Sequence, residues 1–121
     1  MIVLANDDPA SASYDRGKMK DGGEIGAVVE MTKLDPSVSE GELLAKIDEF
    51  NEDPEIDGII VQLPLPKHIS EEKVKKAVSP AKDVDGFHPL SPFYPCTPYG
   101  IILYLEQIGF PFRGKNAVVL G

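Results

Sequence analysis

The segment DGIIVQLPLP at residues 57–66 constrains the fold more than any other part of the chain. Three apolar residues in a row, all β-branched, precede Gln62, and such a run is typical of a strand buried on both faces of a parallel sheet. Two prolines follow Gln62, and because proline cannot donate to a central ladder, the strand must end there. The pattern predicts a polar amide at the carboxyl end of a buried strand, where open α/β sheets bind ligands. The alternative is a strand that leads into a rigid loop without a ligand.

The size and charge of the chain narrow its possible partners. Its 121 residues suffice for one compact domain with a real core but not for two. No apolar run approaches the roughly 20 residues that cross a bilayer, and the amino terminus lacks the pattern of a signal peptide. The net charge of −8, without a cluster of lysine or arginine, opposes binding to phosphate backbones. We therefore expect neither a membrane nor a nucleic acid as partner.

Cysteine and histidine usage points away from disulfide and metal chemistry. Cys96 is the only cysteine, so the chain cannot form an internal disulfide, which fits a reducing cytosol. Cys96 could be a nucleophile, but a lone thiol beside a helix start is more often a small buried hydrophobe. His68 and His88 lie far apart, and neither has a neighbour at metal-ligand spacing, so we expect no metal site.

Strand and helix patterns alternate along the whole chain. Ser11 or Ser13 can cap the first helix and Gly22-Gly23 should stop it, Ser39 to Glu42 matches a capping box, and Thr97-Pro98 should start the last helix. That last helix carries one apolar stripe, made of Ile101, Ile102, Leu105 and Ile108. Strands are predicted at residues 2–5, 25–31, 59–61 and 116–120, and helices at residues 11–20, 40–53, 70–78 and 98–108. The alternation predicts an α/β domain with a mainly parallel sheet.

Polar groups should meet at one rim of this sheet. Tyr14 and Lys18 are four residues apart and so share a helix face just after the first strand. Gln62 ends the central strand, and Asp85 lies in the polar loop KDVDGFHP. A ring, an amine, an amide and a carboxylate together could hold a flat heterocycle, and the amine could move a proton if burial lowered its pKa. A solvated helix face would explain Tyr14 and Lys18 equally well, and Asp85 could simply form a turn.

Four short segments, in order, resemble the bifunctional methylenetetrahydrofolate dehydrogenase/cyclohydrolase (FolD) family. They are PAS at residues 9–11 with Tyr14 and Lys18, DGIIVQLPLPKHI at 57–69, KDVDGFHP at 82–89 and PCTPYGI at 95–101. The middle two are highly specific, and the resemblance covers nearly all of the chain.

The resemblance implies a role for each matching residue. Lys18 would be the catalytic amine, transferring a proton during hydrolysis of a methenyl ring, and Gln62 would hydrogen-bond near the reacting centre and tune Lys18. Tyr14 would stack on the pterin or aminobenzoyl group, and Asp85 would bind the polar edge of the pterin. The same cleft would be lined by Ser11, Val61 and Leu63. The implied reactions are the NADP-dependent oxidation of 5,10-methylenetetrahydrofolate and the hydrolysis of its product to 10-formyltetrahydrofolate.

The resemblance also implies a domain organisation. Residues 1–115 would form a folate-binding catalytic domain, with helices on both faces of its sheet. Residues 116–121 would be the first strand of a Rossmann-type NADP domain that is largely absent from this chain. Gly121 matches the first glycine of the phosphate-binding turn that would hold the cofactor. Tetrahydrofolate derivatives would be the partners of a cytoplasmic enzyme that is a homodimer at full length.

The chain departs from the family pattern at several points. It begins inside what resembles the first strand, and the loop at residues 90–94 is shorter than usual. Asp15 and Asp21 stand where the family favours apolar residues, and Gly22-Gly23 should weaken the helix that carries Lys18. These departures suit a fragment of a full-length enzyme, or a divergent short chain that binds folate or a protein without a redox step.

For the isolated 121-residue chain we expect no appreciable dehydrogenase activity. A non-enzymatic interaction module is the alternative, with an exposed patch formed by Phe87, Phe93, Tyr94 and Tyr99. Four aromatic residues around one loop are more often packed into the core and its turns than exposed at an interface.

Overall fold

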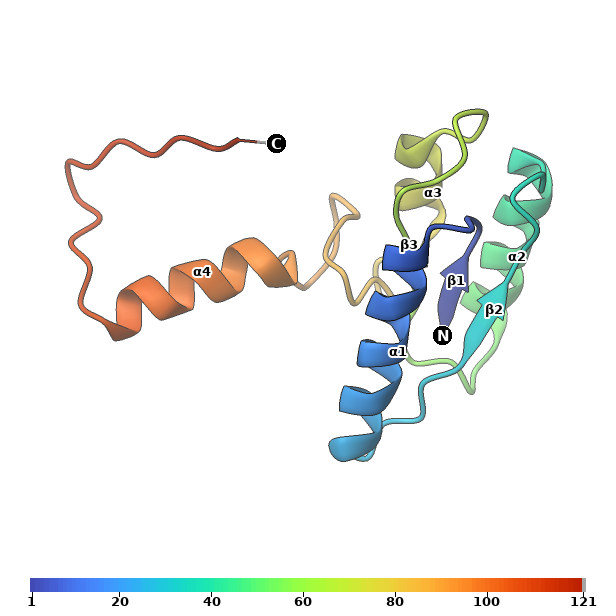
Figure 1. The fold of residues 1–121 in the computed structure, drawn as a ribbon, viewed down its shortest axis with the longest axis horizontal. Helices are drawn as coiled ribbons and strands as arrows, with labels where there is room; N and C mark the ends of the chain where they lie inside the picture. Colours follow the sequence, from blue (N-terminus) through green and yellow to red (C-terminus); the bar gives the residue numbers. More distant parts are fainter. Residues whose placement is uncertain (121) are drawn as a thin grey trace.

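The computed structural model describes residues 1–120, except for the side chains of residues 9–15. Over this range the chain forms three strands and four helices (Figure 1). In chain order they are β1 (Ile2–Leu4), α1 (Pro9–Glu24), β2 (Met31–Lys33), α2 (Glu40–Glu52), β3 (Ile60–Gln62), α3 (Glu71–Ala77) and α4 (Cys96–Gln107).

The three strands form a parallel sheet in the order β2-β1-β3, as the alternating pattern predicts. Ile2 is opposite Met31 in β2 and Ile60 in β3, and Leu4 is opposite Gln62. Because parallel strands end at the same edge, the loop after β1 and the loop after β3 leave the sheet side by side. Asn6 Nδ2 donates a hydrogen bond to the carbonyl of Pro64 at 2.7 Å and so joins these two loops.

The core lies between the sheet and the pair of helices α2 and α3. Val3 packs there, together with residues that recur at helical spacing in α2 and with Val74 of α3. Each such buried aliphatic side chain stabilises the fold by about 1.5–3 kcal/mol. Figure 1 shows α1 on the side of the strands away from α2, so helices cover both faces of the sheet. The buried core cluster comprises Val3, Leu43, Ile47, Phe50, Ile59, Ile69, Val74 and Val78.

Both ends of α2 are held by side chains. At the amino end, Ser39 and Glu42 form the predicted capping box. At the carboxyl end, Lys82 Nζ donates to the carbonyls of Phe50 at 3.0 Å and Asp53 at 2.6 Å. Since a helix leaves its last carbonyls without partners, this lysine both caps α2 and attaches the chain just before Asp85 to the core.

The region between β1 and α2 differs from its prediction. The helix does not stop at Gly22-Gly23 but continues to Glu24, and Gly26, with φ of 82°, follows it. The second strand is Met31–Lys33 and shares only Met31 with the predicted range 25–31. Pairing decides the outcome, because residues 31–33 lie in register with β1, whereas Ile25 and Val28 are exposed.

The carboxyl-terminal part also differs from its prediction. The last helix begins at Cys96 after Pro95, without the side-chain cap expected from Thr97. Its apolar stripe is not buried, and Figure 1 shows α4 projecting away from the sheet. Residues 116–120 do not form the predicted strand. Apolar content alone does not make a strand, which needs a neighbour to receive its hydrogen bonds, and Val118, Val119 and Leu120 are exposed.

Candidate functional site

Lys18 and Gln62 meet at the carboxyl edge of the sheet. Lys18 lies on α1, which follows β1, and Gln62 is the last residue of β3. Lys18 Nζ donates a hydrogen bond to Gln62 Oε1 at 2.9 Å. The contact joins residues 44 positions apart, so it depends on the fold and not on local sequence. The predicted meeting of this amine and this amide is therefore present in the structure.

The Gln62 side chain is held in one orientation. Its Nε2 donates to the carbonyl of Leu63 at 2.8 Å, which leaves Oε1 directed at Lys18. The peptide bond between Leu63 and Pro64 is cis. Because Gln62 is held by its Nε2, its Oε1 offers Lys18 Nζ an acceptor at a fixed position, and this defines where the Lys18 amine lies at the edge of the sheet.

Asp85 reaches the same rim from the loop that follows α3. Ile59 and Asp83 form a parallel bridge, and Ile59 N donates to the carbonyl of Lys82 at 2.7 Å. This short stretch therefore runs beside β3 in the same direction, and Asp85 comes level with the end of the strand. The loop then turns at Gly86, whose φ is 71°.

The electrostatic surroundings of Asp85 come from three sources. Burial raises the pKa of the Asp85 carboxyl above its ordinary value, the positive charge of Lys18 lowers it, and the negative charge of Asp83 raises it again. The amine of Lys18 and the carboxylate of Asp85 therefore interact through their charges. Lys18 thus links Gln62, by a hydrogen bond, to Asp85, by charge.

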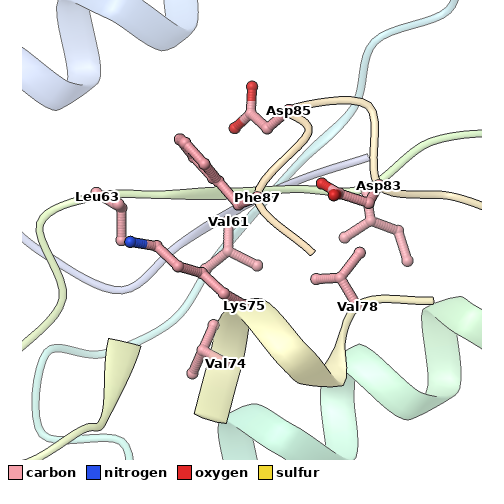
Figure 2. Close-up of a pocket in the computed structure, with 9 residues that line it drawn as sticks. Val61, Leu63, Val74, Lys75, Val78, Asp83, Asp85 and Phe87 are labelled. Atoms are coloured by element: carbon pink, nitrogen blue, oxygen red, sulfur yellow. The ribbon is translucent and has the colours of Figure 1, made fainter. Parts of the chain in front are cut away.

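A small pocket lies against this loop (Figure 2). Its volume is about 20 Å³, which is room for one water molecule, so a heterocycle would lie across its mouth. Figure 2 shows Asp85 above Phe87, and Lys75 extending from α3. The residues that line the pocket are Ile59, Val61, Leu63, Val74, Lys75, Val78, Asp83, Asp85 and Phe87.

The pocket includes residues that sequence reasoning did not assign to the site. Val61, Leu63 and Asp85 are predicted site residues, whereas Lys75 and Phe87 are not. Lys75 Nζ lies 5.1 Å from the centre of the Phe87 ring. From the sequence, Lys75 is expected simply as a positive charge in the last turn of a helix. Only the packing of α3 against the loop shows that it also lies over the Phe87 ring.

Three predicted site residues lie outside what the structure describes. They are Gly121 and the side chains of Ser11 and Tyr14, although the backbone of residues 11 and 14 belongs to α1. Their proposed contacts with a ligand remain predictions.

The aromatic residues and the thiol near α4 are more exposed than predicted. Phe87, Phe93, Tyr94 and Tyr99 are all exposed, and the rings of Tyr94 and Tyr99 lie 5.4 Å apart. Cys96 is also exposed and is not the small buried residue expected from its context. These side chains share one reason for their exposure: α4 has no buried residue and so does not cover this part of the loop.

Comparison with known proteins assigns the family. The family described as "Tetrahydrofolate dehydrogenase/cyclohydrolase, catalytic domain" matches residues 1–85. The chain belongs to the tetrahydrofolate dehydrogenase/cyclohydrolase family. A relative named "Bifunctional protein FolD", from Paracidovorax citrulli, is 52% identical over 129 aligned positions. These positions include 99% of this chain and 46% of the relative.

Solved structures of family members have the same fold. The bifunctional enzyme FolD of Campylobacter jejuni matches with a TM-score of 0.91 and 38% identity, over 99% of this chain and 46% of that one. The enzyme of Trypanosoma brucei, described as complexed with NADP cofactor and inhibitor, matches with a TM-score of 0.87 and 26% identity, over 94% of this chain and 42% of that one. This chain therefore spans about half the length of the family members it matches. In the part that the structure describes, no helix is long and apolar enough to cross a membrane.

Proposed function

We propose that this chain supplies the folate-binding, catalytic part of a bifunctional enzyme of one-carbon metabolism. The enzyme would oxidise 5,10-methylenetetrahydrofolate to the 5,10-methenyl compound with NADP, and would hydrolyse that product to 10-formyltetrahydrofolate, a one-carbon donor for purine biosynthesis. Family membership supports the substrate class. The observation that carries the proposal is the 2.9 Å hydrogen bond between Lys18 Nζ and Gln62 Oε1 at the carboxyl edge of the sheet.

In the hydrolytic step, Lys18 moves the proton. Water adds to the methenyl carbon and gives up a proton, and one carbon–nitrogen bond of the five-membered ring then breaks. Lys18 can transfer protons between the added water and the departing ring nitrogen, and such general acid–base assistance is worth about 10²–10⁴-fold in rate. Gln62 holds the Lys18 amine by its Oε1 and so fixes the point from which the proton is delivered.

The remaining site residues bind and orient the substrate. Asp85 accepts hydrogen bonds from the polar edge of the pterin, and its partial burial strengthens them because little water competes. The ring lies across the mouth of the pocket, over Val61 and Leu63. Ser11 and Tyr14, whose backbone belongs to α1, would complete the cleft, and the Tyr14 ring would stack on the ligand.

The described residues do not fit a dinucleotide by themselves. A phosphate-binding turn presents backbone amides at the start of a helix after a strand, and residues 116–120 form no strand. NADP would therefore bind chiefly to a second domain, with Gly121 at its edge and a boundary near residue 115. The whole enzyme would be a cytoplasmic homodimer.

Replacement of Lys18 by methionine tests the proposal. Purified 121-residue chain, wild type and Lys18→Met, is mixed with 5,10-methenyltetrahydrofolate, whose loss of absorbance reports hydrolysis above the uncatalysed rate. Binding of 5-formyltetrahydrofolate is measured by calorimetry. We expect the variant to lose hydrolysis by at least about 100-fold and to keep binding within about threefold, because the amine acts on the reaction more than on affinity. Parallel samples with methylenetetrahydrofolate and NADP should yield no appreciable NADPH.

Lys20→Met is the matched control. Lys20 is two positions further along α1, where its side chain is exposed and pairs with Glu24 at 3.7 Å. It should hydrolyse and bind like the wild type. If the wild-type chain binds no folate, or if Lys18→Met leaves hydrolysis unchanged, the proposal is wrong, and the exposed aromatic residues would then favour an interaction module.

A further inference from the structure

The loop that carries Asp85 is organised around a second carboxylate, that of Asp83. Asp83 is 3% exposed, which is unusual for an aspartate. Its Oδ1 accepts a hydrogen bond from Gly86 N at 3.1 Å, and its Oδ2 accepts one from His88 N at 2.7 Å. Its own carbonyl accepts a hydrogen bond from Ser91 Oγ at 3.0 Å. One buried residue therefore holds the chain at three points downstream of itself.

The position of Asp83 explains why its contacts affect Asp85. Asp83 is attached to the sheet by its bridge to Ile59, and its carboxylate holds the residues three and five positions later. Asp85 lies inside the loop that these contacts close. Figure 2 shows the two carboxylates apart on this loop, and both residues line the pocket. The carboxylate of Asp83 is already engaged by the amides of Gly86 and His88.

The turn at Gly86 closes the loop further. A Cβ at Gly86 would come within 2.6 Å of the Tyr94 carbonyl carbon, which shows how closely the loop packs on the backbone of residues 93–95. Burying a carboxylate costs free energy unless hydrogen bonds compensate it. Because two backbone amides bind the buried Asp83 carboxylate, Asp83 is better explained as a residue that fixes the turn than as one that merely fills space in the core.

We propose that Asp83 is the positioning residue of the site: by binding the amides of Gly86 and His88, it holds Asp85 where Asp85 binds the ligand. The second half of this statement depends on the proposed function, since that proposal makes Asp85 a ligand-binding group. The first half concerns the loop alone and is testable without a ligand.

Replacement of Asp83 by asparagine separates positioning from general support of the fold. Asparagine keeps the size and one acceptor, but its amide nitrogen would face the N–H of Gly86 or of His88. The charges that act on Asp85 are those of Lys18 from α1 and Asp83 from its own loop, and Lys75 from α3 lines the same pocket. The substitution changes only Asp83. In ¹³C-labelled chain, the carboxyl resonance of Asp85 is titrated, and the hydrogen exchange of the Gly86 and His88 amides is followed.

We expect three changes in Asp83→Asn. The pKa of Asp85 falls because a nearby negative charge is lost and the loop admits water. The two amides exchange at least about tenfold faster, and tetrahydrofolate binds about tenfold more weakly. Asp48→Asn, which removes one carboxylate from the exposed face of α2, should change none of these. Loss of the Asp83 charge alone would lower the pKa of Asp85, so the two amides and the binding decide the role. A residue that only supported the fold would lower the stability of the chain without selectively exposing the Gly86 and His88 amides or weakening binding.

The outcomes are distinct. A folded Asp83→Asn in which the Gly86 and His88 amides keep their wild-type protection overturns the inference, whatever the pKa of Asp85 does. If the variant does not fold, the wild type decides: the Gly86 and His88 amide shifts must follow the titration of the Asp83 carboxyl, and independent titration overturns the inference. If the pKa and the amides change but the wild type binds no tetrahydrofolate, the proposed function fails while the positioning role of Asp83 holds.

Discussion

Asp85, the proposed ligand-binding carboxylate, has a protonation equilibrium that affects the stability of the fold. Burial raises the pKa of its carboxyl above the ordinary value of 3.8, in spite of Lys18 nearby. The pKa of Asp85 is therefore higher in the folded state than in the unfolded state, where it has the ordinary value of 3.8. Between these two pKa values the folded state binds a proton more tightly, so the stability of the fold decreases as the pH rises through that interval. At pH values above that interval, Asp85 is ionised in both states, and the folded state carries the full free-energy cost of burying its charge. A carboxyl that lowers stability when ionised is consistent with the proposed role of Asp85 in binding, since binding groups often cost stability.

We expect Asp85→Asn to be more stable than the wild type at pH 7 and to bind tetrahydrofolate about 10- to 100-fold more weakly, because a charge-assisted acceptor is lost. Urea unfolding at a series of pH values measures the first effect. The difference in the free energy of unfolding should shrink as the pH falls and should vanish below 3.8, where Asp85 is protonated in both states. A variant that is less stable than the wild type at pH 7 would contradict this account.

Gly86 is the residue at which a single methyl group should matter most. Its φ of 71° disfavours any side chain, and a Cβ would lie within 2.7 Å of backbone atoms of residues 93–95, which cannot move aside easily. We expect Gly86→Ala to lower the free energy of unfolding by about 2–4 kcal/mol. Gly41→Ala is the control, since this α2 position has nothing within 4 Å and should gain about 0.5–1 kcal/mol. Equal unfolding midpoints in urea for the two variants would disprove the argument.

At the residue scale, the sequence identifies groups that lie where chain elements end, but not those that depend on packing. Gln62 can be predicted because it ends a strand, Asp85 because it lies in a polar loop, and Lys18 because it lies on the helix after β1. Asp83 and Lys75 are different. An aspartate in a polar loop and a lysine in a last helical turn are ordinary in the sequence, and only burial of the one and the aromatic neighbour of the other set them apart.

At the scale of elements, the helix that carries Lys18 contains adjacent glycines with different surroundings. A Cβ at Gly23 would meet nothing within 4 Å, whereas a Cβ at Gly22 would lie 2.4 Å from Val29 Cγ2. Both glycines lie in α1, where alanine is favoured over glycine by about 0.5–1 kcal/mol. The pair therefore separates helix propensity from packing within one turn.

We expect Gly23→Ala to increase helicity by circular dichroism and to raise the free energy of unfolding by about 0.5–1 kcal/mol. Gly22→Ala should gain nothing, or lose up to about 2 kcal/mol, because Val29 must shift. If both variants are stabilised alike, the chain after α1 does not pack as the structure describes.

Elements with strong local signals were predicted well, and elements that depend on partners were not. The capping box and helical spacing define α2, and the apolar run before two prolines defines β3 to within one residue. The predicted strand at 25–31 was displaced because register with β1 selects residues 31–33. The predicted strand at 116–120 has no neighbouring strand within the described part of the chain. Local patterns describe propensity, whereas pairing is a property of the whole fold.

At the scale of the whole molecule, packing is unevenly distributed. The core lies between the sheet and the helices α2 and α3, and every buried hydrophobic residue that the structure describes lies between residues 2 and 78. α4 has no buried residue, although it is rich in isoleucine, leucine and tyrosine. A helix of 12 residues is marginal in water without tertiary contacts, so the two parts of the chain should differ in local stability.

Hydrogen exchange measured by mass spectrometry tests this difference in the 121-residue chain. We expect peptides from β1 and α2 to be protected by about 10³-fold or more, because their amides open only when the core unfolds. Peptides from α4 should exchange at least about 100-fold faster, since opening this helix exposes little additional apolar surface. Raising the protein concentration tenfold is the control, because self-association through α4 would slow its exchange, whereas local instability would not depend on concentration. Protection of α4 equal to that of α2 at every concentration would show that this helix is held by packing that the structure does not contain.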